Sequence, residues 1–389
     1  MNGVSADMNL RNAALQRSIS RRRFLWDVAR TTAGASVCSF KALGQTLRAP
    51  SPAKKLIVVT FGGGARDEET FAPEGQRFIP RMLGELIPCA TFFTQVVNRG
   101  ILGHYVANAT LATGCYESFD NFAPTSPRNP TLFEYYRRDS AHRAEDVWVI
   151  APSNGFDRIG ASNHPGYGTS FGATMVLPKQ LLGRFATGSS ESFDHLLRDS
   201  YEDTSRVSAS DNHATSLQLL ADQLKLPVSQ FLAYASSISS PDELSLYIAQ
   251  HLMQHLAPNL LWITLHDIDV AHAGAYSLYT DAILRTDRIC AELWKSIQLN
   301  PEYKNKTNMF VMPDFGRDGD FEPGGNGFQH HRTGDPLSRT TWMLALGPEI
   351  HENISVDRMV ESIDLVPTLA AILGCNASFA AGKPLAEVL

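Results

Sequence analysis

The sequence has 389 residues, of which 43% are hydrophobic and 19% are charged. This balance is that of an ordinary globular protein, and it excludes a collagen-like or largely disordered chain. Residues 1–44 contain seven of the 34 Lys and Arg but only two of the 40 Asp and Glu, which leaves 27 basic and 38 acidic residues to the rest. An acidic body argues against nucleic acid or an anionic membrane surface as its main partner.

The basic N-terminus contains the sequence SRRRFL at residues 20–25, which fits the twin-arginine export pattern S-R-R-x-F-L. The weakly apolar stretch that follows, residues 28–43, is too polar to span a membrane and ends in small residues typical of a cleavage site. We therefore expect residues 1–44 to be a signal peptide and the twin-arginine export machinery to be a partner. The mature protein is then periplasmic or secreted, with no stable membrane anchor. A basic tail without a targeting role is the alternative.

The rest of the chain alternates short apolar runs with helical patterns, which predicts an α/β fold with a mostly parallel sheet and helices on both faces. The predicted strands are 56–61 (LIVVTF), 146–150, 260–265 (LLWITL), 309–312 and 341–346. The predicted helices are 130–138, 276–298 and 357–373. We expect one domain over residues 45–389, in which the Ser- and Asp-rich, then helical, region 187–255 is a cap inserted over the sheet edge.

Carboxylates and histidines follow the predicted strands, at the edge where open α/β sheets bind their ligands. Carboxylates combined with neutral imidazoles suit Zn²⁺ or a similar first-row ion. We expect a divalent metal, zinc first with manganese or calcium as alternatives. The candidate ligands are Asp267 or Asp269, His272, Asp314, and His330 or His331.

Each of these features also has a purely structural interpretation. An Asp at a strand end is often a helix N-cap, His272 alone could be packed inside the protein, and His330-His331 could be a surface pair. The glycine run at 62–64 could be a tight turn, or a backbone anion nest with Arg66 as a clamp. Their joint order and spacing favour the functional interpretation.

That order resembles the alkaline phosphatase superfamily, which includes sulfatases, nucleotide pyrophosphatase/phosphodiesterases and cofactor-independent phosphoglycerate mutases. The resemblance covers most of residues 55–389. Segment 103–114, ending in LATG, is similar to the helix that carries the family's nucleophile. Asp267 or Asp269 with His272-Ala-Gly is similar to the family's Asp…His-x-Gly motif. Asp314-Phe-Gly partly matches Asp-His-Gly, and residues 362–369 (SIDLVPTL) are similar to the sulfatase C-terminal helix.

The sequence departs from the family at three positions. Gly63 stands where the first strand ends in Asp, Phe315 replaces the His of Asp-His-Gly, and His104 stands where the nucleophile is Ser, Thr or Cys. Members of the family bind two metal ions. This chain has the ligands of the first site, whereas the second site lacks the first-strand Asp and the His of Asp-His-Gly. We therefore expect about one tightly bound divalent ion per chain.

The resemblance implies an exported, metal-dependent hydrolase of a phosphate, phosphonate or sulfate ester, with a small-molecule anionic ester as substrate. Under this hypothesis His104 acts as nucleophile, acid/base or further metal ligand. Arg66 and Arg317 then bind the substrate anion as a clamp. The alternative is a non-catalytic metal- or anion-binding protein on a degenerate hydrolase scaffold, because a fold does not dictate a function.

Overall fold

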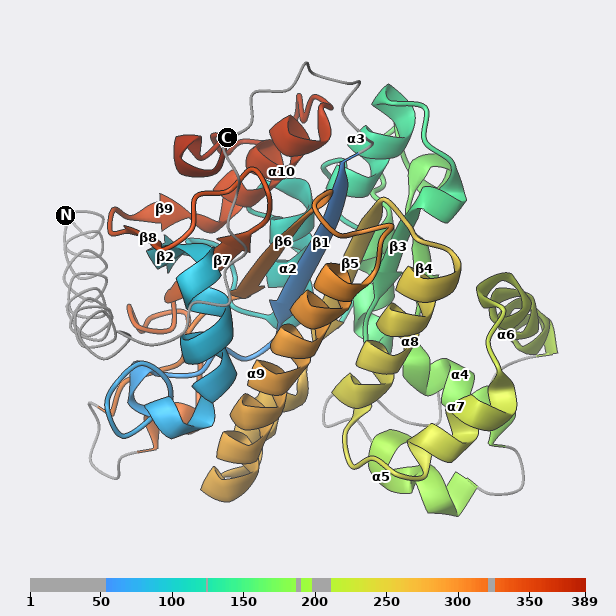
Figure 1. Ribbon diagram of the computed structural model, residues 1–389, viewed down its shortest axis with the longest axis horizontal. Helices are drawn as coiled ribbons and strands as arrows, with labels where there is room; N and C mark the ends of the chain where they lie inside the picture. The colour runs from blue at the N-terminus through green and yellow to red at the C-terminus, as the bar shows by residue number, and fades with distance from the viewer. Residues whose placement is uncertain (1–53, 124, 187–189, 198–210, 321–325) are drawn as a thin grey trace.

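The computed structural model describes residues 54–123, 125–186, 190–197, 211–320 and 326–389, so the predicted signal peptide lies outside the described residues. Its centre is one sheet with the strand order β4-β3-β5-β1-β6-β7-β2-β8, in which β9 also pairs with β2 (Figure 1). The strands are β1 (Lys55–Phe61), β2 (Ala90–Val97), β3 (Val147–Ile150), β4 (Thr174–Val176), β5 (Leu260–Leu265), β6 (Thr307–Pro313), β7 (Thr340–Leu346), β8 (Ile354–Val356) and β9 (Val360–Glu361).

All strand pairs of this sheet are parallel except the two that β7 makes with β6 and β2. The prediction of a mostly parallel sheet is therefore confirmed, and each of the five predicted strands is present. The sequence pattern did not predict β2, because the polar residues Thr91, Thr94 and Gln95 interrupt its apolar run. These polar groups are buried and satisfied by the chain segment next to β8; Gln95, for example, donates to the Asp357 carbonyl at 2.8 Å.

Alternate residues of each central strand enter two hydrophobic cores, one on each face of the sheet. In β1, Ile57 and Val59 enter one core, whereas Leu56 and Val58 enter the other. This is the pattern of a sheet covered by helices on both faces, as predicted. The first core is covered by α8 (Pro241–His255) and α9 (Tyr276–Leu299), and the second by α2 (His104–Thr113), α3 (Leu132–Asp139) and α10 (Leu365–Leu373).

The helix predicted for 357–373 begins later than expected, at Leu365. The chain before it pairs with β2 as β9 and then forms a 3-10 turn, Ser362–Asp364. Edge pairing thus replaces the first helical turns, because the neighbouring strand offers hydrogen bonds that the local sequence pattern does not reveal.

The helices around the predicted cap lie beyond one end of the sheet, at the lower right of Figure 1. They are α4 (Pro178–Phe185), α5 (Asp194–Leu197), α6 (Asp211–Leu224) and α7 (Val228–Ala235). Leu217 of α6, Phe231 of α7 and Leu252 of α8 all belong to the same core as the sheet. In its described parts, the region 187–255 therefore extends the main core, and α8 packs directly on the sheet.

The central strands end level with one another, since Phe61 of β1 pairs with both Leu265 of β5 and Pro313 of β6. The chain segments that follow these strands consequently meet at one edge, as predicted, and the N-terminus of α2 arrives there as well. Among the described residues, no helix combines the length and the apolar character needed to cross a membrane.

Candidate metal centre

The segment that follows β5 is a 3-10 helix, η10 (Asp267–Ala273), which Gly274 ends in the left-handed conformation. A 3-10 helix has three residues per turn, so side chains three positions apart lie on the same face. His266, Asp269 and His272 have this spacing. Asp269 Oδ1 is 3.2 Å from His272 Nε2, and its Oδ2 is 3.6 Å from His266 Nε2. Asp269 and His272, three positions apart, therefore lie side by side on one face of η10.

Asp267 points to a different place. Its carboxylate accepts hydrogen bonds from the Ser240 hydroxyl and from Arg285, whose Nη1 is 3.0 Å away. The sequence left Asp267 and Asp269 as alternative ligands, and the structure brings only Asp269 to the histidines. Asp267 instead connects η10 to the helices behind it.

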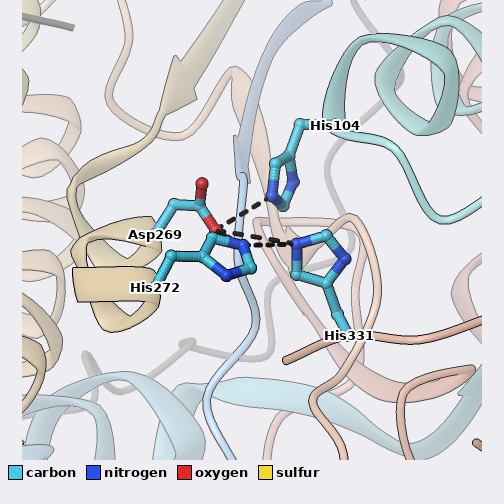
Figure 2. A group of neighbouring side chains, drawn as sticks. All are labelled: His104, Asp269, His272 and His331. Carbon is cyan, nitrogen blue, oxygen red and sulfur yellow. Dashed lines mark hydrogen bonds and ion pairs between the residues drawn. The ribbon is translucent and has the colours of Figure 1, made fainter. Parts of the chain in front are cut away.

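Four side chains converge at the edge of the sheet: His104 from α2, Asp269 and His272 from η10, and His331 from the segment before β7 (Figure 2). Their candidate ligand atoms all lie within 4.8 Å of one another. Asp269 Oδ1 is 3.0 Å from His104 Nε2 and 3.8 Å from His331 Nε2, and the Nε2 atoms of His272 and His331 are 2.8 Å apart. Ligands about 2.1 Å from a tetrahedral ion lie about 3.4 Å from each other. The four distances between ligand atoms given above, 2.8 to 3.8 Å, lie on both sides of that value, so these side chains fit one divalent ion.

Two of these histidines are oriented by bonds from their outer nitrogens. His104 Nδ1 lies 2.8 Å from Asp314 Oδ2, and His331 Nδ1 lies 3.1 Å from the Leu102 carbonyl. Donation of the outer N–H to a carboxylate or a carbonyl leaves Nε2 facing the centre, which is the usual arrangement of metal-binding histidines. Asp314 is fully buried and stands behind His104, so the structure places it as a partner of the cluster instead of a member.

The buried carboxylates control the charges of the cluster. Burial opposes the charged form of His104, but Asp269 and Asp314 raise its pKa to about 10. Burial also opposes the charge of Asp269, yet the neighbouring His104 holds the pKa of that carboxyl well below its usual range. Burial, together with the charges of His104 and Arg317, lowers the pKa of His331 to about 2, which keeps this ring neutral and able to bind a metal.

Arg317 is fully buried beside the cluster. Its Nη2 lies 2.9 Å from Asp269 Oδ1, and its Nη1 donates to the Phe328 carbonyl at 3.1 Å. A side chain at Gly63 would meet Arg317 Nη2 at 2.6 Å. The guanidinium thus occupies the space that the missing side chain at position 63 leaves open, and it supports Asp269 from inside the protein.

Arg66 is also buried and engaged. Its Nε lies 2.9 Å from Glu69 Oε2, and its Nη1 lies 2.8 Å from Asp320 Oδ1. Both guanidinium groups are thus bonded to carboxylates of the protein itself, and the role of Arg66 and Arg317 in holding a substrate anion stays a prediction.

Three further positions complete the comparison with the sequence predictions. Of the pair His330-His331, only His331 reaches the cluster. Phe315, which stands where the family has His, stacks on the His104 ring with centroids 4.8 Å apart. His266 was not predicted as a site residue; its position three residues before Asp269 is the signal that could have found it. Within the described ranges, this cluster is the only group of three or more His, Cys, Asp or Glu with ligand-like spacing.

Comparison with protein-family models and with curated proteins gives no match. Solved structures do match over most of the chain. The alkaline phosphatase PafA aligns with a TM-score of 0.54 and 11% identity, over 87% of this chain and 100% of that one. The phosphonate monoester hydrolase from Silicibacter pomeroyi aligns with a TM-score of 0.50 and 13% identity, over 85% of this chain and 76% of that one. Murine ectonucleotide pyrophosphatase/phosphodiesterase 5 aligns with a TM-score of 0.50 and 13% identity, over 85% and 97%. At such identities the likeness concerns the fold alone, and this chain shares the mostly parallel α/β fold of these three hydrolase-type structures.

Proposed function

We propose that the protein is a hydrolase of phosphate, phosphonate or sulfate esters that uses one divalent metal ion. The convergence of Asp269, His272 and His331 at the carboxyl edge of the sheet is the observation that carries this proposal. The fold supports it, since structures that share the fold include a phosphatase and a phosphonate monoester hydrolase. Two imidazoles and a carboxylate suit zinc better than calcium, which prefers six to eight oxygen ligands.

Asp269, His272 and His331 would hold the ion and leave a fourth position open, as in catalytic zinc sites. The His272 side chain is 33% exposed, so the cluster opens to solvent on its side. A divalent ion bound there would polarise an ester oxygen and lower the pKa of a water molecule.

His104 is the candidate acid/base. Its Nε2 faces the centre, and Asp314 holds its Nδ1 at 2.8 Å, which fixes the orientation of the ring. Because the two carboxylates raise its pKa to about 10, His104 is protonated at neutral pH in the metal-free protein, so it would act as a general acid whose Nε2–H is oriented by the bond to Asp314. The cluster consists of three histidines and one aspartate, and the step proposed on it is direct attack of a water molecule on the ester.

One observation favours the second candidate, a binding protein without catalysis. His104 Nε2 is close enough to Asp269 to serve as a fourth ligand, and four protein ligands make the closed site of a structural zinc centre. The two functions therefore differ in what His104 does when the metal is bound.

The test is a panel of p-nitrophenyl phosphate, phenylphosphonate and sulfate esters supplied with Zn²⁺ or Mn²⁺, with metal content measured in parallel. The hydrolase proposal expects turnover that His272→Ala abolishes, and expects His104→Gln to keep the metal while losing turnover. Tight zinc binding that weakens in His104→Gln, with no ester cleaved by the wild-type protein, would establish the binding protein instead.

We also propose that the mature protein is exported, so that the ester is met in the periplasm or outside the cell. The support is the SRRRFL sequence at residues 20–25 and the acidic body behind it.

A further inference from the structure

The 3-10 helix η10 is held from behind by the first turn of α8. Asp242, near the start of α8, is fully buried. Its carboxylate accepts the backbone N–H of His266 at 2.9 and 3.0 Å and the backbone N–H of Asp267 at 2.8 Å. The first amides of a helix have no partner within the helix, and no side chain of η10 itself caps them. Asp242 therefore caps η10 from another element.

Two further contacts connect the same end of η10 to its surroundings. The Asp267 side chain accepts the hydroxyl of Ser240, the N-cap residue of α8, and the guanidinium of Arg285 in α9. One side of η10 is thus fastened to α8 and α9, while the face that carries Asp269 and His272 is directed at the centre. A rotation of η10 about its axis would break the bonds to Asp242 and move both candidate ligands together.

We propose that Asp242 is a positioning residue for the metal centre, and that it sets the orientation of η10 and through it the positions of Asp269 and His272. This inference rests on the proposed metal site. Under this proposal α8 not only packs on the sheet but also holds the ligand-bearing helix η10 in position. Groups that orient metal ligands from outside change metal affinity 10–100-fold when they are removed. By reciprocity, a bound metal must strengthen the contact between α8 and η10.

Asp287 provides a matched control. It is equally buried, lies in α9, and its carboxylate accepts two consecutive backbone N–H groups, those of Arg81 at 3.0 Å and Met82 at 2.7 Å. These amides begin η3 (Met82–Leu86), which contributes no residue to the cluster. Asp242→Asn and Asp287→Asn therefore make the same change, in which one of two accepting oxygens becomes an NH2 group facing a backbone N–H, but only the first makes it at the ligand-bearing helix.

The experiment measures the dissociation constant of Zn²⁺ by competition with a chromogenic chelator, and the stability of the metal-free proteins by urea unfolding. We expect both variants to lose stability, and Asp242→Asn to bind Zn²⁺ about 10–100-fold more weakly while Asp287→Asn stays within about threefold of wild type. Equal zinc affinities in the two variants would overturn the inference.

If Asp242→Asn does not fold, Ser240→Ala serves as the milder variant, because it keeps the Asp242 carboxylate and removes only the hydroxyl that bonds Asp267 and accepts the backbone N–H of Asp242 at 3.2 Å. Zinc binding several-fold weaker than wild type supports the inference, and unchanged binding overturns it. A wild-type protein that binds no Zn²⁺ would refute the metal centre itself. Wild-type binding that neither variant disturbs would refute only the role of Asp242.

Discussion

Replacing His104 by glutamine removes the buried ring that lies between two carboxylates, and the effect on stability should depend on pH in a defined way. In the metal-free folded protein Asp269 and Asp314 raise the pKa of His104 to about 10, against an ordinary value of 6.5. Between these values the folded protein holds one more proton than the unfolded chain. The stability from His104 is therefore complete below about pH 6.5 and is lost as the pH rises through the folded pKa.

The size of the effect follows from the same shift. One proton gives a slope of about 1.4 kcal/mol per pH unit, and the full shift corresponds to roughly 5 kcal/mol. The assay is urea unfolding of wild type and His104→Gln in EDTA, at intervals from pH 6 to 10. Comparison with the variant cancels the titration of groups that do not interact with His104. We expect wild type to lose stability relative to His104→Gln as the pH increases. Parallel curves would show that His104 carries no proton between the carboxylates, and would refute the charge assignment of the cluster.

Three further outcomes are expected. Gly63→Ala should lower the free energy of unfolding by about 2 kcal/mol or more, because position 63 has a φ of 79° and a Cβ there would meet the buried guanidinium of Arg317 at 2.6 Å. Urea unfolding measures this change. The control is Gly334→Ala, where a Cβ meets nothing within 4 Å, and its stability should change little. Elemental analysis of protein purified without chelator should find about one divalent ion per chain, and far less in His272→Ala; two ions per chain would contradict the single-site reading. Replacing Arg21 and Arg22 by lysine should leave precursor in the cytoplasm, as fractionation and immunoblotting would show, and normal export of that variant would rule out the twin-arginine signal.

The sequence by itself determined the core of the fold and the edge at which the cluster lies. Runs such as LIVVTF and LLWITL are short, apolar and rich in β-branched residues, so they have few alternatives to a buried parallel strand. Once these strands are parallel, the residues that follow them must meet at one edge. This local information predicted that Asp267 or Asp269, His272 and Asp314 would lie near one another. The sequence did not predict the strand β2, because its buried threonines and glutamine are stable there only through hydrogen bonds to a distant segment of the chain.

Only the tertiary structure decided which side chains form the centre. The choice of Asp269 over Asp267 depends on residues 267–273 being helical, since residues three positions apart, such as Asp269 and His272, share a face of a helix whereas residues five positions apart do not. His104 and Asp314, which bond each other at 2.8 Å, are 210 positions apart in the chain. The sequence did not reveal that the guanidinium of Arg317 is buried in the space beside Gly63. Side-chain direction is set by helix type and by neighbours from distant parts of the chain, and a local sequence pattern contains neither.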